Sequence, residues 1–247
     1  MRAIVAALED DSTAPGVAGA AVALGRLFAA EVELLNVREH GRSATAEAAA
    51  AAAGLTLSTL AGDPYAVLSA AAAREDVVAL IVAAGDGAHR LAETTRALIT
   101  SVSKPVVVVP GGYGAAGGIA RVLVPLDGTP ASAAALSEIV EMAAEAEVEI
   151  VLVHVLDAAN LPAFGDQLAH EVRVWSDAFI SRNAPSARNA RLELRVGEPA
   201  AGIEEALAES HADLVALGWS RELTEGRAAV VSELLVAAGV PVLLTPA

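Results

Sequence analysis

The sequence has no cysteine, few aromatic residues and no long apolar run. Only 3% of its 247 residues are Phe, Trp or Tyr, although 55% are hydrophobic. Without cysteine, the chain can form no disulfide and cannot use a thiolate as a nucleophile or metal ligand. Arg, Asp, Glu or Gly interrupts every apolar stretch before it reaches the length of a membrane span, so we expect no transmembrane helix. The small, mostly aliphatic side chains favour helices packed closely on a sheet over an aromatic-lined pocket.

Positive charge is also scarce. The chain carries 16 Lys and Arg against 31 Asp and Glu, which gives a formal net charge of −15. Nucleic acids and anionic membranes attract proteins through clustered Lys and Arg, so neither is an expected partner. The apolar segment near the N-terminus is too short for a signal peptide, and acidic residues follow it directly. We therefore expect a cytoplasmic protein.

One stretch, Arg121–Leu136, organises the second half of the chain. Val122–Leu126 has the composition of a buried strand, Asp127–Thr129 indicates a turn, and the apolar spacing that follows predicts a helix. Ligands of open parallel sheets bind beyond the carboxyl ends of the strands, which is where this turn would lie. A weaker copy of the same opening, Arg2–Leu8 followed by three acidic residues, stands at the N-terminus.

The later parts of these two copies match almost without gaps. Gly62–Pro64 corresponds to Gly197–Pro199, and Lys104–Pro110 corresponds to Val240–Pro246. A glycine-rich stretch between the copies is typical of a flexible linker. The predicted division is a first unit over residues 1–110, a linker over 111–118 and a second unit over 119–247.

Each copy is expected to supply five strands. They are Ala3–Leu8, Val32–Val37, Leu55–Leu60, Val77–Ala84 and Val106–Val109 in the first, and Val122–Leu126, Val148–Val155, Arg191–Val196, Leu214–Leu217 and Val242–Leu244 in the second. Short β-branched runs that alternate with helical patterns predict an α/β fold with a parallel, doubly wound sheet. The second copy has room for a full helix over Leu168–Ile180 before its third strand. The first has only the alanine-rich segment Arg42–Ala53, which predicts a short helix with little to bury.

The order of these motifs resembles a tandem universal stress protein over essentially the whole chain. The resemblance is carried by the Val-Pro-Leu-Asp-Gly opening, by the second-strand segment Val153–Val155, by Gly197–Pro199 and by the last strand of the second copy. It implies two flavodoxin-like, adenine nucleotide alpha hydrolase-like units, each a five-stranded, mostly parallel sheet with helices on both faces. It also implies that the two last strands pair, as in a pseudo-dimer, which would cover two hydrophobic edges.

The same resemblance supplies a candidate nucleotide site in the second copy. Family members that bind ATP have an Asp after the first strand, a backbone contact at the end of the second, and Gly-x-x-Gly-(nine residues)-Gly-Ser/Thr after the fourth. The glycines let backbone amides approach phosphate oxygens at a helix N-terminus. Transferred to this chain, the candidate adenine nucleotide site consists of Pro125, Asp127, Val155, Gly218 and Arg221.

This pattern is incomplete in both copies. Arg221 stands where the second glycine is expected, and no Gly-Ser occurs near Ala228–Val231. In the first copy Gly85–Ala88 lacks the second glycine, and Glu93–Thr95 replaces Gly-Ser. Glu9–Asp11 then places three carboxylates at the tip of the first strand. These acids would either repel a triphosphate or form a solvated turn that caps the next helix with the help of Ser12 or Thr13.

Catalysis and metal binding are not expected. The chain has five histidines, and none has metal-ligand spacing to another. His154 lies within a predicted strand and indicates a packed core or interface residue, while Ser132 indicates a residue of the first helical turn. Trp219 could stack on an adenine, although a loop tryptophan that covers the end of the sheet is the favoured interpretation.

The sequence therefore predicts a non-catalytic universal stress protein-like chain that acts in stress response through interaction or signalling, with an impaired nucleotide site. The alternative hypothesis is an ATP-binding sensor that uses the second unit. The expected partners are accordingly an adenine nucleotide, with ATP as the candidate, another protein, or a second copy of the chain.

Overall fold

The structure is a computed structural model that describes residues 1–38, 43–85, 91–114, 117–156, 168–220 and 227–246. For residues 168–172 and 227–229 only the backbone is described. The chain folds into two compact units. The first comprises Met1–Ile119 together with Trp219–Pro246, and the second comprises Ala120–Gly218.

The sheet of the first compact unit is built on the N-terminal strands. Its strands are β1 (Ala3–Ala7), β2 (Glu31–Val37), β3 (Leu57–Leu60), β4 (Val77–Ala83), β5 (Val106–Val109) and β10 (Val242–Pro246). They follow the order β3-β2-β1-β4-β5-β10. The neighbours from β3 to β5 run parallel, and β10 runs antiparallel to β5 with Leu243 opposite Val107. The predicted pairing of the two last strands is therefore confirmed, and the paired aliphatic residues of both strands are buried.

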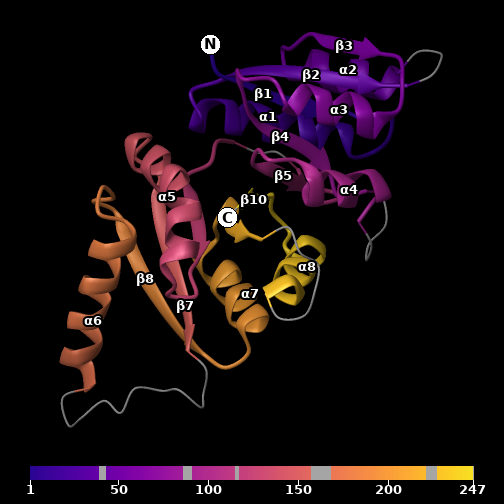
Figure 1. Ribbon diagram of the computed structural model, residues 1–247. Coiled ribbons are helices and arrows are strands. Elements are labelled where there is room, and N and C mark those ends of the chain that lie inside the picture. The colour runs from indigo at the N-terminus through magenta and orange to yellow at the C-terminus, as the bar shows by residue number, and fades with distance from the viewer. Residues whose placement is uncertain (39–42, 86–90, 115–116, 157–167, 221–226, 247) are drawn as a thin grey trace. The chain divides into compact units, whose positions relative to one another are not determined.

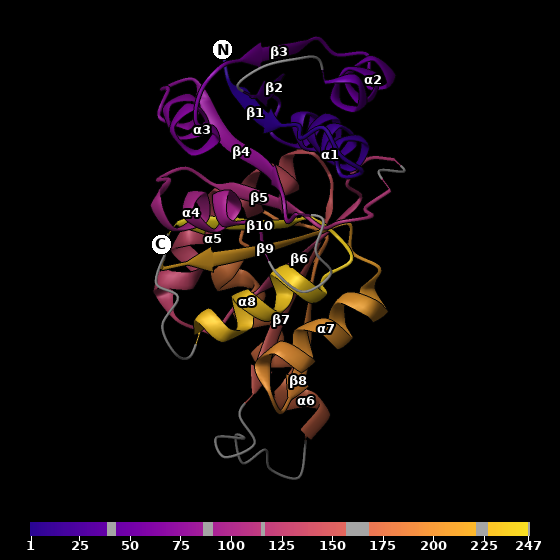
Figure 2. The ribbon, with the colours of Figure 1, turned by 90° about the vertical axis from the view of Figure 1, so that its right-hand side faces the viewer.

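Helices cover both faces of this sheet. α1 (Ala14–Leu27) and α2 (Ala44–Ala52) lie on one face, and α3 (Pro64–Ala72) and α4 (Glu93–Ser101) lie on the other (Figure 2). α8 (Arg227–Ala237) belongs to the same compact unit. The core is built on the aliphatic side chains of β1, β4 and β5, in which every residue except Val78 is buried.

The second compact unit repeats the arrangement. Its strands are β6 (Arg121–Pro125), β7 (Glu149–Leu156), β8 (Ala190–Val196) and β9 (Leu214–Trp219), and the last residue of β9 belongs to the first unit. They follow the order β9-β6-β7-β8, and all the pairs are parallel. α5 (Pro130–Glu145) and α6 (Leu168–Asn183) lie on one face, and α7 (Pro199–Ser210) lies on the other (Figure 1). The predicted α/β fold with a mostly parallel sheet is confirmed.

The matching Gly-acid-Pro turns have a local physical cause. Gly62 and Gly197 adopt φ values of +142° and +129°, a region that side chains disfavour. The following acid caps the helix, because Asp63 and Glu198 each accept a hydrogen bond from a backbone N–H three residues on, at 2.8 and 2.9 Å. Proline then occupies the first turn, where its missing N–H costs nothing. All these features lie within one turn of the chain, so the starts of α3 and α7 are specified by the local sequence.

The two second crossovers differ as predicted. α2 spans nine residues and buries only Ala46, Ala49 and Ala50, whereas α6 spans sixteen. α2 packs against α1, and alanine is small enough to permit that close approach. Among the described residues, no helix is both long and apolar enough to cross a membrane.

Candidate functional site

The turn after β6 is closed by hydrogen bonds to Asp127. Its Oδ1 accepts from the Thr129 backbone N–H at 2.9 Å, from the Thr129 hydroxyl at 2.7 Å and from the Ser132 hydroxyl at 2.5 Å. Thr129 is the N-cap of α5, and its own Oγ1 accepts from the Ser132 backbone N–H at 3.3 Å. One carboxylate oxygen thus joins the strand end to the first turn of the helix. Ser132 is a first-turn residue, as predicted.

The other candidate residues gather at the same edge of the sheet. The Leu126 N–H donates to the Val153 carbonyl at 2.8 Å, and β6 ends opposite Val153 while β7 continues to Leu156, so Pro125, Asp127 and Val155 lie at one edge. The Val155 side chain points to the α7 face, where a Cβ on Gly202 would lie 3.1 Å from Val155 Cγ2. A contact between the Val155 backbone and a ligand stays a prediction.

Gly218 lies near the end of β9, next to β6 in the sheet. A Cβ at this position would lie 3.3 Å from the Ala135 Cβ and 3.8 Å from the Ser132 Cα, so the strand end packs directly on the start of α5. This close packing is enough to account for a glycine at position 218, whether or not a phosphate binds there. Arg221 lies outside the described residues.

Sequence reasoning missed the aromatic cluster that His154 joins. The His154 Nδ1 lies 2.8 Å from the Leu126 carbonyl oxygen. The His154 ring centroid lies 5.6 Å from that of Trp175 and 5.3 Å from that of Phe179, and the latter two are 5.0 Å apart. His154 is partly exposed and contacts both the β6–α5 turn and α6. The four-residue spacing of Trp175 and Phe179 was a visible signal, because it places both on one face of a helix.

The acidic turn of the first copy holds the N-cap residue of α1 and caps the start of α2. Asp11 Oδ1 accepts from the Thr13 backbone N–H at 2.8 Å and from its hydroxyl at 2.6 Å. Asp10 Oδ1 accepts from the Thr45 backbone N–H at 2.8 Å, at the start of α2. This backbone donor lowers the pKa of Asp10 below its ordinary value. The turn predicted over Glu9–Asp11 is confirmed, but its expected capping of the next helix is wrong, because the N-cap of α1, Thr13, makes no side-chain cap hydrogen bond. The helix whose start an acidic residue of this turn does cap is α2, which the sequence did not indicate.

In the first copy, the described residues at the position of the phosphate loop contact other parts of the protein. Thr95 is buried, and its hydroxyl donates to the Ala83 carbonyl at 2.7 Å. Gly85 has a φ of +116°, and a Cβ there would lie 3.2 Å from the Ala92 backbone nitrogen. Residues 86–90, which include most of the predicted Gly85–Ala88 segment, lie outside the described residues.

The Trp219 side chain is buried within the protein. Trp219 is the last residue of β9, lies in the first compact unit and is only 2% exposed. Its indole N–H donates to the Ile99 carbonyl at 3.0 Å. The expectation of a loop tryptophan is wrong, because the strand extends through this residue and buries it.

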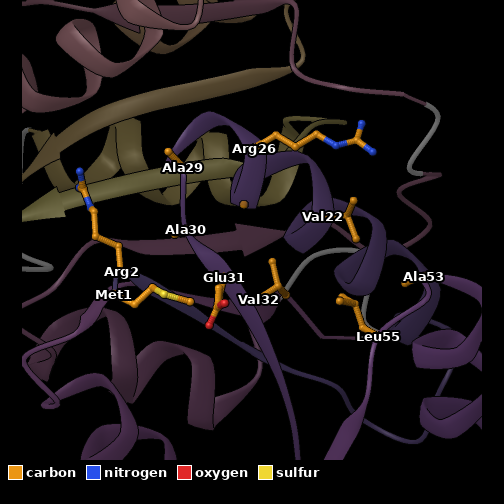
Figure 3. A pocket seen from close by; sticks show the side chains of 11 residues that line it. Met1, Arg2, Val22, Arg26, Ala29, Ala30, Glu31, Val32, Ala53 and Leu55 are labelled. Atoms are coloured by element: carbon orange, nitrogen blue, oxygen red, sulfur yellow. The ribbon is translucent and has the colours of Figure 1, made fainter.

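A pocket of about 410 Å³ lies elsewhere in the first compact unit, at the amino ends of β1 and β2 (Figure 3). Its walls include Val22, Val32 and Leu55, with Arg2 and Arg26 at the rim. Figure 3 shows the two arginine side chains pointing away from each other, so they do not converge on one anion. Parallel sheets bind ligands at the opposite, carboxyl ends of their strands. Within the described residues, no group of three or more His, Asp or Glu could hold a metal ion.

Comparison with known proteins agrees with this architecture. The model of the universal stress protein family matches residues 118–246, slightly more than half of the chain. A universal stress protein from Archaeoglobus fulgidus is 14% identical, with a TM-score of 0.68 over 99% of this chain and 98% of its own. A putative universal stress protein from Pseudomonas aeruginosa is 14% identical, with a TM-score of 0.67 over 100% of this chain and 93% of its own.

These two likenesses concern the fold, and both extend over the full length of the chain. No curated protein matches the sequence at a significant level. The family match falls on the second copy, where the opening strand, the Val-His-Val strand and the Gly-Glu-Pro turn were found. The chain belongs to the universal stress protein family.

Proposed function

We propose that this universal stress protein acts without catalysis, through protein interaction or signalling in a stress response, and that its nucleotide site is impaired. The observation that carries the proposal is the closed turn at Asp127. Three donors already occupy its Oδ1. A nucleotide that recruited this oxygen would have to replace hydrogen bonds that cap α5, and a cap is worth about 1 kcal/mol.

The phosphate end of the site supports the same proposal. Backbone amides can cradle phosphates only where glycines keep the approach open. Gly218 packs on the start of α5, and the sequence has Arg221 where the second glycine is expected. In the first copy the Thr95 hydroxyl is buried and donates to Ala83, so it does not face a ligand.

The absence of catalysis rests on the chemistry of the described polar groups. Ser132 donates to Asp127, but that carboxylate also accepts two hydrogen bonds from the N-cap threonine, so it serves the helix start. His154 directs Nδ1 to the Leu126 carbonyl and its ring to Trp175 and Phe179. An activated nucleophile needs a base that a third group orients toward it. The only carboxylate that Ser132 contacts among the described residues is Asp127, whose hydrogen bonds from Thr129 hold the helix start, so we propose no nucleophile there.

A second candidate function is an ATP sensor in the second copy. It is favoured by one observation, the convergence of Pro125, Asp127 and Val155 at the carboxyl edge of the sheet. In that case Arg221 would neutralise phosphate charge in place of the missing glycine.

The test is mass spectrometry of small molecules released from the purified protein, followed by calorimetric titration with ATP and Mg²⁺. We expect no co-purified adenine nucleotide and no saturable binding up to about 1 mM, an affinity near 4 kcal/mol. Stoichiometric adenine nucleotide would overturn the proposal. Arg221→Ala then separates the alternatives, because it should weaken ATP binding about tenfold or more if Arg221 holds phosphate. Arg188→Ala, at an exposed arginine of the second copy, is the matched control.

A further inference from the structure

The two copies share a side-chain contact that joins their first two strands. In the first, the Asn36 Nδ2 donates to the Leu8 carbonyl at 2.6 Å. In the second, the His154 Nδ1 lies 2.8 Å from the Leu126 carbonyl. Each acceptor residue also donates its own N–H, at 2.8 Å, to the carbonyl of the residue just before the Asn or His. Asn36 and His154 therefore occupy the same register position, although one is an amide and the other an imidazole.

The contact defines the protonation of the imidazole. A backbone carbonyl can only accept a hydrogen bond, so the Nδ1 of His154 must carry the hydrogen. In the neutral ring, Nε2 is then the unprotonated nitrogen. The ring also lies close to the turn itself, because a Cβ on Gly128 would be 3.3 Å from the His154 Cε1. Gly128 adopts a φ of +81°, so it both turns the chain and leaves room for the ring.

The imidazole differs from the amide in what lies on its other side. Trp175 and Phe179 on α6 both contact the His154 ring, at centroid distances of 5.6 and 5.3 Å. Tilted aromatic pairs at such distances are attractive. In the first copy the corresponding crossover helix is α2, whose buried side chains are all alanine. His154 is thus the side chain that contacts α6 and the turn carrying Asp127 at the same time.

We propose that His154 is a positioning residue that couples the Asp127 turn to α6. A ligand or a partner that displaces the turn changes the hydrogen bond to Leu126, and the imidazole transmits this change to Trp175 and Phe179. Conversely, a partner that binds α6 changes the turn. The coupling does not depend on whether a nucleotide binds, so it goes beyond the proposed function.

The first test is nitrogen NMR of the histidine side chain in the whole protein. We expect the neutral imidazole to carry its proton on Nδ1 and to leave Nε2 unprotonated. His154→Asn keeps a donor of the kind found at Asn36, and His154→Ala removes it. We expect the Asn variant to recover at least half of the melting-temperature loss of the Ala variant. A proton on Nε2 instead of Nδ1, or no recovery by Asn, would overturn the hydrogen-bonding role.

The second test measures the coupling itself. The chain has two tryptophans, so Trp175→Phe assigns the Trp175 indole N–H resonance. Thr129→Ala perturbs the turn and should shift that resonance in the wild-type background. The shift should disappear in the His154→Asn background, which keeps the carbonyl contact and loses the ring. Thr13→Ala, the same change in the first copy, is the control and should leave the resonance unmoved. An equal shift with and without the imidazole would overturn the coupling.

Discussion

The turns after β1 and β6 reach the same hydrogen-bonding solution from different sequences. Asp11 and Asp127 each accept from the backbone N–H and the hydroxyl of the threonine two residues on. The first copy places two more residues before its aspartate, and one of them, Asp10, caps α2. The common feature is that the aspartate holds the N-cap threonine of the next helix. An aspartate at this strand end is therefore explained before any ligand is considered, and nucleotide binding needs independent evidence.

The two copies differ in how closely the third helix approaches the sheet. In the second, Gly202 brings α7 against Val155 and Arg195, where a Cβ would lie 3.1 and 3.2 Å from their side chains. Val67 occupies the corresponding position in α3, five residues after its glycine, and Leu60 at the end of β3 is 42% exposed. The glycine in α7 thus accompanies close packing on the end of β8, whereas the valine in α3 accompanies an exposed end of β3.

The largest predicted effect comes from making the second copy resemble the first at this position. Gly202→Val would force branched carbons against Val155 and Arg195 and should reduce the free energy of unfolding by about 2–3 kcal/mol. Urea denaturation measures this loss. Val67→Ala is the control in the first copy, where we expect less than about 1 kcal/mol because that side chain is only partly buried. Equal losses in the two variants would contradict the difference in packing.

Next comes the buried contact of the first copy. Asn36→Ala removes the donor to the Leu8 carbonyl at a side chain that is 3% exposed, and it should cost about 1–3 kcal/mol. Thermal unfolding provides the measurement. Asn189→Ala removes a similar amide that donates to the Val148 carbonyl at 2.9 Å from an exposed residue, and water can replace it. If both variants cost the same, burial does not determine the strength of the contact.

The capping comparison predicts equal effects in the two copies. Asp11→Ala and Asp127→Ala each remove the acceptor of two threonine donors and should each cost about 1 kcal/mol. Chemical denaturation of the single variants tests this. If Asp127→Ala costs several times more stability than Asp11→Ala, the hydrogen bond from Ser132 contributes most of the stabilisation at Asp127.

The smallest effects concern surface ion pairs, which both copies have near the amino ends of their strands. Hydrogen bonds from Arg74 lower the pKa of Glu33, and hydrogen bonds from Arg121 and Arg191 lower the pKa of Glu149. A lowered pKa in the folded state stabilises the protein above the unfolded-state pKa. This stabilisation is lost as the pH falls from about 4.5 through the lower folded-state pKa.

Glu33→Gln and Glu149→Gln should therefore cost less than about 1 kcal/mol near pH 7 and nothing at low pH, because the two carboxylate side chains are 39% and 31% exposed. Unfolding measured across this pH range, with and without salt, checks the sign. A variant whose deficit grows as the pH falls would contradict it.

Local patterns were sufficient to locate the strands to within about two residues, as β5 illustrates, where the predicted and observed bounds are both Val106–Val109. Apolar β-branched runs end at glycines and prolines, so composition marks their ends. The last two residues of β9 were missed because Trp219 is held by a hydrogen bond to Ile99, which is far away along the chain. The sequence also located Asp127, but it could not show that Oδ1 is already occupied.

The sequence by itself determined the repeat, the Gly-acid-Pro helix starts and the parallel α/β class, because each depends on residues within one turn or one strand. Only the tertiary structure decided that Asn36 and His154 are counterparts, that Asp10 caps α2 and that Gly202 meets Val155. The physical reason is register: these contacts join segments 28 or more residues apart, and their distances depend on how strands align and how closely helices approach them.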